Sequence, residues 1–149
     1  MHKILIAEDD NELRDLFVRV LSRYDYEVHG VSDGEEALCA IKNEYFDLLI
    51  SDIMMPRRDG YSLLRALREA KNTTPVLLIT AKDAFDDMRR GFLLGGDDYM
   101  IKPVNINEMV LRVQALIRRA EMQRNRTQRR MLAHTLMARG RTMYLYRRG

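Results

Sequence analysis

Short apolar runs alternate with helical patterns through the first 120 residues of this 149-residue chain. The runs have the length of β-strands and are apolar almost throughout, which is typical of strands that a parallel sheet buries on both faces. Between them, apolar residues recur at helical spacing. This alternation predicts an α/β fold with a doubly wound five-stranded parallel sheet, five helices and right-handed crossovers. The predicted strands are residues 4–7, 26–31, 46–52, 75–80 and 98–101.

Local signals predict where several helices begin and end. Asp33 with Glu36, and Asn105 with Glu108, have the spacing of N-terminal capping pairs. A fourth helix is expected from about Asp83, and the glycine pair that follows Leu94 should end it.

Charge divides the chain into two parts. Residues 1–117 carry 15 Lys and Arg against 21 Asp and Glu, whereas residues 118–149 carry ten Arg and the single acid Glu121. We therefore expect one complete domain over residues 1–120 and an Arg-rich linker and tail over residues 121–149.

The conformation of the tail is open at this point. A β-hairpin that turns at Gly140 fits the pattern, and a short helix over Met131 to Met137 fits nearly as well. If the hairpin forms, the tail is the start of a truncated effector domain.

The sequence also predicts a cellular compartment. The single cysteine, Cys39, allows no intramolecular disulfide and no cysteine-rich metal site, and we expect it to be a buried apolar residue. The first apolar run is cut off by acids at residues 8–10, which makes it too short for a signal peptide or a membrane span. We expect a soluble cytoplasmic protein without membrane contacts.

Polar residues follow four of the five predicted strands. The carboxyl ends of parallel strands meet at one edge of a sheet, where ligands bind. Carboxylates gathered there repel one another, and a hard divalent cation such as Mg²⁺ relieves that repulsion. A lysine and a threonine would face an anion that joins the metal, and phosphate fits both. The residues at this edge are Glu8, Asp9, Asp10, Asp52, Thr80 and Lys102.

Four motifs in order resemble those of the receiver domains of two-component response regulators. They are ILIAEDD at residues 4–10, LLISDIMMP at 48–56 with Asp59-Gly60 after it, LLITAK at 77–82, and GGDDYMIKP at 95–103. The resemblance covers residues 1 to about 120. It implies a flavodoxin-like fold with strand order 2-1-3-4-5 and a cis peptide bond before Pro103.

The resemblance also implies a role for each residue at the predicted edge. Asp52 would be the phosphoacceptor, Lys102 would contact the phosphoryl group, and Thr80 and Tyr99 would be the switch pair. Asp10 is either a further acid of the site or the cap of the first helix. The implied Mg²⁺ ligands are Glu8, Asp9, Asp52 and the main-chain carbonyl of Met54.

The implied partner is a sensor histidine kinase that donates a phosphoryl group from a phosphohistidine. The chain would then catalyse only the phosphorylation and dephosphorylation of its own aspartate, and it would not be an enzyme in the wider sense. On phosphorylation, Thr80 is expected to turn toward the phosphoryl group, and Tyr99 to rotate from an exposed to a buried position.

Three outputs are compatible with the sequence. In the first, the chain belongs to the winged-helix OmpR/PhoB-like class, whose phosphorylated receivers dimerise and control DNA binding through an effector domain that is absent or incomplete here. In the second, a stand-alone receiver docks on a partner protein. In the third, the basic tail binds nucleic acid directly.

The predicted dimer surface is made by the fourth helix, the fifth strand and the fifth helix. The fourth helix carries Met88 and Leu93 where the OmpR/PhoB-like class usually has a lysine and a glutamate. The residues expected to form cross-subunit ion pairs are Asp97, Asp98, Glu108, Arg112 and Arg119.

Overall fold

The structure is a computed structural model that describes residues 1–81 and 85–148, with side chains given outside residues 85–87 and 140–148. Strands and helices alternate along the described residues. In chain order they are β1 (Lys3–Ala7), α1 (Asn11–Ser22), β2 (Glu27–Val31), α2 (Gly34–Asn43), β3 (Leu48–Asp52), α3 (Gly60–Glu69), β4 (Val76–Thr80), α4 (Phe85–Leu93), β5 (Asp98–Ile101) and α5 (Ile106–Arg148).

All strand pairs are parallel, and the strand order is β2-β1-β3-β4-β5. This confirms the flavodoxin-like α/β fold predicted from the sequence. β2 lies at one edge of the sheet and is its least buried strand, as the weak apolar character of residues 26–31 indicates. The three central strands, β1, β3 and β4, are buried on both faces because helices cover both sides of the sheet.

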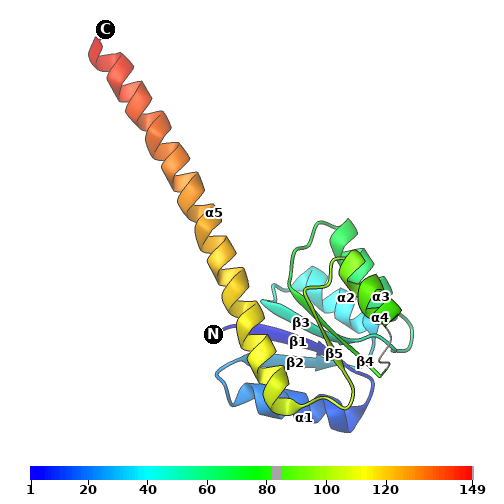
Figure 1. Cartoon of the computed structure of the whole chain (residues 1–149). Helices are drawn as coiled ribbons and strands as arrows, with labels where there is room; N and C mark the ends of the chain where they lie inside the picture. The colour runs from blue at the N-terminus through cyan, green and yellow to red at the C-terminus, as the bar shows by residue number, and fades with distance from the viewer. Residues whose placement is uncertain (82–84, 149) are drawn as a thin grey trace. The chain divides into compact units, whose positions relative to one another are not determined.

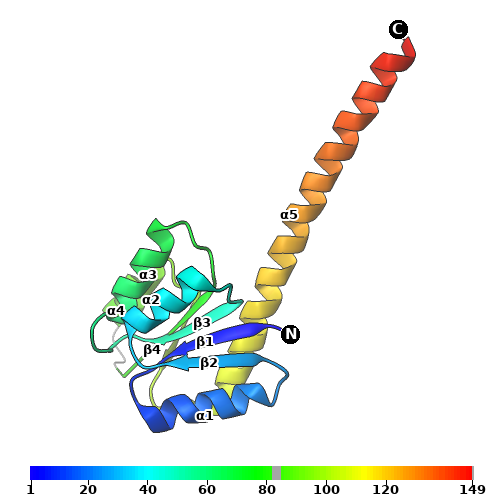
Figure 2. The ribbon, with the colours of Figure 1, turned by 180° about the vertical axis from the view of Figure 1, so that it is seen from behind.

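Alternate side chains of each central strand enter two separate cores. In β1, Ile4 and Ile6 pack with residues of α1 and the first turns of α5, whereas Leu5 and Ala7 pack with α2 and α3. Figure 1 and the view from behind in Figure 2 show α1 on one face of the sheet and α2, α3 and α4 on the other. The two cores hold the strands in register and so fix the carboxyl edge of the sheet.

The predicted capping residues bind the first turns of their helices. The amide of Glu36 donates to Asp33 Oδ1 at 2.8 Å, and the amide of Glu108 donates to Asn105 Oδ1 at 3.0 Å. Asp10 caps α1 by accepting a hydrogen bond from the amide of Leu13 at 3.1 Å, which favours the capping alternative for this residue. The start expected for the fourth helix, at about Asp83, lies outside the described residues.

The chain divides into two compact units, Met1–Ile117 and Arg118–Gly149. Helix α5 continues through Arg148, so the β-hairpin at Gly140 is wrong. Met131 to Met137 are helical, as in the alternative, but they belong to this long helix and not to a short helix of their own. The physical reason is composition, because the second unit has no proline and is rich in Arg, Ala, Leu, Met and Gln, all strong helix formers. Among the described residues, no helix is both long and apolar enough to cross a membrane.

Cys39 is exposed, so the expectation of a buried cysteine is also wrong. Ala37, Leu38 and Ile41 form the buried face of α2, and Cys39 lies between them in sequence on the solvent side of the helix. Its Sγ accepts a hydrogen bond from Asn43 Nδ2 at 3.4 Å.

Gly60, the first residue of α3, lies directly against the backbone at the end of β3. A Cβ at Gly60 would lie 2.5 Å from the carbonyl oxygen of Asp52 and 2.9 Å from Ile53 Cα. Because backbone atoms cannot move aside without distorting β3, Gly60→Ala should lower the free energy of unfolding by about 1–3 kcal/mol in equilibrium urea denaturation.

Gly30→Ala is the matched control for that measurement. Its Cβ would approach only side-chain atoms, those of Arg14 at 3.1 Å and of Val18 at 3.4 Å, and the flexible Arg14 side chain can move. We expect a change within about 0.5 kcal/mol. Equal effects of the two substitutions would contradict the role assigned to Gly60.

Candidate functional site

Four strands end at the same edge of the sheet, and each places there either its last residue or the residue that follows it. Glu8 follows β1, Asp52 ends β3, Thr80 ends β4 and Lys102 follows β5. Asp52 lies opposite Ile79 in the register of β3 with β4, so Thr80 is one residue beyond it at the same edge. The side chains of Glu8 and Asp52 are buried, with 2% and 5% exposed.

Lys102 connects the two buried carboxylates. Its Nζ lies 2.9 Å from Glu8 Oε1 and 2.8 Å from Asp52 Oδ2. Burial alone would lower the pKa of Lys102, but hydrogen bonds to Asp52 and Glu8 outweigh it and raise the pKa above its ordinary value. The amide of Lys102 donates to the carbonyl of Thr80 at 2.6 Å, and the peptide bond before Pro103 is cis, as expected. Backbone and side chain together place one cation between two acids.

A single lysine does not neutralise this group of acids. Carboxylate oxygens of Glu8, Asp9 and Asp52 lie within 4.8 Å of one another. Burial raises the pKa of Glu8 to about 7, the hydrogen bond from Lys102 opposes this rise, and nearby Asp52 and Asp9 add to it. Three oxygen donors this close, one of them solvent-exposed, fit the ligand preference of a hard divalent cation.

The loop after β3 is anchored at both ends. The amide of Ile53 donates to the carbonyl of Ile79 at 2.9 Å, and the amide of Gly60 donates to the carbonyl of Ile53 at 2.8 Å. Between these anchors the Met54 side chain is 67% exposed, so it contributes little to the core. A role for Met54 through its main-chain carbonyl stays a prediction.

Tyr99 is buried under α4, with 5% of the residue exposed. Its ring centroid lies 6.4 Å from that of Phe92, and a Cβ added at Gly91 would come within 3.2 Å of the ring. The structure therefore has Tyr99 in the inward position that the sequence analysis expects after phosphorylation. The rotation itself stays a prediction.

The residues expected at the dimer surface are largely engaged within the chain. Arg112 binds Asp98 at 2.8 Å and Glu108 at 2.8 Å, and these two hydrogen-bonded acids raise the pKa of its guanidinium. Asp97 binds Arg68 at 3.1 Å. Arg119 is an exposed residue of α5.

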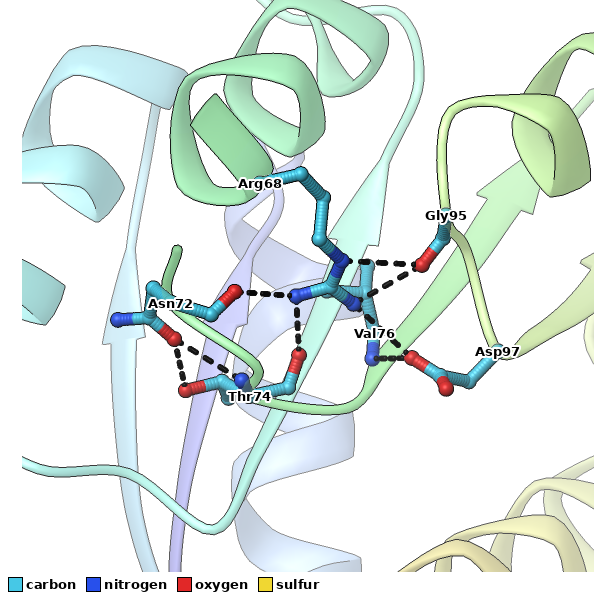
Figure 3. Close-up of polar contacts among 6 residues, drawn as sticks. All are labelled: Arg68, Asn72, Thr74, Val76, Gly95 and Asp97. Atoms are coloured by element: carbon cyan, nitrogen blue, oxygen red, sulfur yellow. Dashed lines mark hydrogen bonds and ion pairs between the residues drawn. The ribbon is translucent and has the colours of Figure 1, made fainter. Parts of the chain in front are cut away.

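The sequence did not point to Arg68, whose partners directly precede β4 and β5, at the amino-terminal edge of the sheet and away from Asp52. Its guanidinium bonds to main-chain carbonyls and to Asp97 (Figure 3). No residue pattern marks such a site, because carbonyl acceptors are present at every position of a chain.

A parallel sheet in this order, with three acids and a lysine at its carboxyl edge, defines a receiver-type domain of the flavodoxin-like fold. The family of response regulator receiver domains matches residues 4–114, and the chain belongs to this family. This confirms the family predicted from the sequence motifs.

Relatives of this chain are transcriptional regulators, which supports the OmpR/PhoB-like class. Transcriptional regulatory protein CiaR of Streptococcus pneumoniae is 42% identical over 120 residues, which are 80% of this chain and 53% of CiaR. The alkaline phosphatase synthesis transcriptional regulatory protein PhoP of Bacillus subtilis is also 42% identical, over 80% of this chain and 50% of PhoP. The chain spans about half the length of the curated relatives that it matches.

Solved receiver structures have the same fold. The Francisella response regulator 1452 receiver domain is 34% identical with a TM-score of 0.78, covering 80% of this chain and 98% of that domain. Chemotaxis protein CheY4 of Vibrio cholerae is 29% identical with a TM-score of 0.74, covering 78% of this chain and 98% of CheY4.

Proposed function

We propose that this chain accepts a phosphoryl group on Asp52 from a phosphohistidine of a sensor histidine kinase and transmits that event to a transcriptional output. The observation that carries the proposal is the position of the buried Asp52 at the carboxyl edge of the sheet, beside two other acids and 2.8 Å from Lys102. An isolated structural aspartate would need neither the neighbouring acids nor the shared cation.

The proposed reaction is an in-line displacement at phosphorus. A carboxylate oxygen of Asp52 forms the new P–O bond while the P–N bond to the kinase imidazole breaks, and the electron pair leaves with the imidazole. Lys102, already held at this carboxylate, balances charge on the transferred phosphoryl oxygens. Attack of water on phosphorus later releases inorganic phosphate and restores the carboxylate.

Mg²⁺ is the proposed cofactor. The carboxylates of Glu8, Asp9 and Asp52, with the main-chain carbonyl of Met54, would hold it, and the clustered carboxylate oxygens support this assignment. When bound, the ion supplies positive charge that stabilises the phosphoryl oxygens.

The proposed switch uses Thr80 and Tyr99. Thr80 is buried at the end of β4, one residue beyond Ile79, which pairs with Asp52; this supports the proposal that its hydroxyl turns toward a new phosphoryl group. That movement changes the space available to Tyr99 under α4 and thereby shifts the surface of α4, β5 and α5 between two populations.

Thr80→Ala should leave phosphorylation of Asp52 intact and prevent the dimerisation that follows it. Without the hydroxyl, Asp52 and Lys102 still carry the reaction, so we expect the intact mass to increase with acetyl phosphate as in the wild type. The phosphorylated variant should remain monomeric in sedimentation velocity runs. Dimerisation equal to that of the wild type would exclude Thr80 from the switch.

The proposed output is a homodimer through α4, β5 and α5 that controls DNA binding by an effector domain outside these residues. The experiment is sedimentation velocity of the full chain in Mg²⁺ with and without beryllofluoride, a mimic of the phosphoryl group. A monomer that becomes a dimer supports this output. A monomer in both states favours the alternative of a receiver that docks on a partner protein.

A second candidate function is nucleic-acid binding by the basic tail. One observation favours it: beyond residue 117, every arginine of α5 whose side chain is described is exposed. Glu121 is the only acid in this segment of the sequence. Such a helix can neutralise backbone phosphates without reading their sequence. These arginines are Arg118, Arg119, Arg124, Arg126, Arg129, Arg130 and Arg139.

Fluorescence anisotropy on a labelled duplex tests the tail. We expect the full chain to bind duplex DNA and a chain ending at Ala120 to bind at least about tenfold more weakly, with affinity falling steeply between about 50 and 200 mM salt. Identical binding by the two chains would remove this candidate and leave the tail as a solvated linker.

A further inference from the structure

Arg68 uses every N–H of its guanidinium to join two connections that are far apart in the sequence (Figure 3). Nη1 donates to the carbonyls of Asn72 at 2.8 Å and Thr74 at 2.9 Å, both in the connection from α3 to β4. Nε and Nη2 donate to the carbonyl of Gly95, at 3.1 and 2.9 Å, in the connection from α4 to β5. Nη2 also donates to Asp97 Oδ2 at 3.1 Å.

Asp97 closes this arrangement against the start of β4. The same Oδ2 accepts the amide of Val76 at 2.8 Å, and the amide of Asp97 donates to the carbonyl of Val76 at 2.9 Å. The Asp97 side chain therefore has one defined orientation, with 38% of it exposed to solvent. We call Arg68, its four partners and Val76 the Arg68 clasp; the partners are Asn72, Thr74, Gly95 and Asp97.

The clasp fixes the backbone position of residues that belong to the proposed dimer surface. Asp98 and Tyr99 directly follow Asp97: Asp98 binds Arg112 of α5, and Tyr99 packs against Gly91 of α4. Gly95 has a positive φ of 100°, which favours glycine, and a Cβ there would lie 3.1 Å from Arg68 Nε. A larger residue at this position would therefore crowd the guanidinium. One side chain on α3 thus sets the start of β5, and with it residues that face both α4 and α5.

We propose that Arg68 is a positioning residue for the dimer surface: it orients Asp97 and the start of β5 so that the phosphorylated chain presents a preformed surface to a second copy. The inference rests on the proposed dimer output. Lysine cannot replace arginine here, because an ammonium has three donors at one point, whereas the clasp needs five N–H groups in a planar fork.

The test compares Arg68→Lys with a matched control, Arg65→Lys, on the exposed side of the same helix. With Mg²⁺ and beryllofluoride, at a temperature where all variants are folded, we expect the dimer Kd of Arg68→Lys to rise about tenfold, which corresponds to 1.4 kcal/mol. Arg65→Lys should dimerise like the wild type, and all three should gain the same mass from acetyl phosphate.

A double-mutant cycle distinguishes positioning from a general loss of stability. If Arg68 acts through Asp97, Arg68→Lys should have little further effect on the Kd in an Asp97→Asn background. Additive effects, or a wild-type Kd for Arg68→Lys, would overturn the inference.

Amide hydrogen exchange tests the clasp independently of dimerisation. A wild-type chain that takes up beryllofluoride but stays monomeric contradicts the proposed output. The clasp is then judged by amide exchange of Val76 and Asp97, which should be faster in Arg68→Lys than in Arg65→Lys. Unchanged exchange would overturn the inference by itself.

Discussion

Asp52→Asn should abolish phosphoryl uptake from acetyl phosphate, because an amide has no carboxylate oxygen to attack phosphorus. The effect should be complete in intact mass spectrometry, and the variant should not dimerise when acetyl phosphate and Mg²⁺ are added. The fold should persist, since Asn is nearly isosteric with Asp and the neighbouring residues of β3 are buried by apolar contacts.

Asp59→Asn is the matched control for this substitution. Asp59 caps α3 by accepting a hydrogen bond from the amide of Ser62 at 2.7 Å, and asparagine caps helices about as well as aspartate. The control should be phosphorylated like the wild type. Phosphoryl uptake by Asp52→Asn at the wild-type rate would mean that another residue is the acceptor.

Lys102→Ala should slow phosphoryl uptake by about 10²–10³-fold, the usual cost of removing one group that stabilises charge in a transition state. It should also lower the free energy of unfolding without Mg²⁺ by about 3 kcal/mol, because two buried carboxylates lose their shared cation. Added Mg²⁺ should restore much of that stability.

Single-turnover mass spectrometry and urea denaturation with and without Mg²⁺ measure these two effects. Lys42→Ala, which removes an exposed lysine from the last turn of α2, is the control and should change neither. Wild-type kinetics in Lys102→Ala would show that the cation assigned to the reaction is the wrong one.

The sheet and the position of the site were predictable from local sequence. Apolar runs such as residues 4–7 and 75–80 have the composition of strands buried on both faces, and the acids and lysine directly after such runs must gather at one edge. The cap Asp33 was predictable for a similar reason, because its partner is three residues away.

What the sequence did not reveal depends on neighbours that are distant in the chain. The bond from Lys102 to Glu8 spans 94 positions, and the bond from Arg68 to Gly95 ends on a carbonyl that any residue could supply. The exposure of Cys39 follows from the rotation of α2 on the sheet. The sequence left the conformation of the tail open because the residues around Gly140 can form either a hairpin or a helix, and a glycine inside a helix costs only about 1 kcal/mol.

In the proposed reaction Asp52 carries the phosphoryl group, and this is tested by locating that group in the wild-type chain. The protein is incubated with Mg²⁺ and acetyl phosphate, the acyl phosphate is trapped by borohydride reduction, and the reduced residue is found by tandem mass spectrometry of peptides. We expect modification at residue 52 that disappears when the Mg²⁺ is chelated. Modification at another residue, or uptake that is unchanged by chelation, would contradict it.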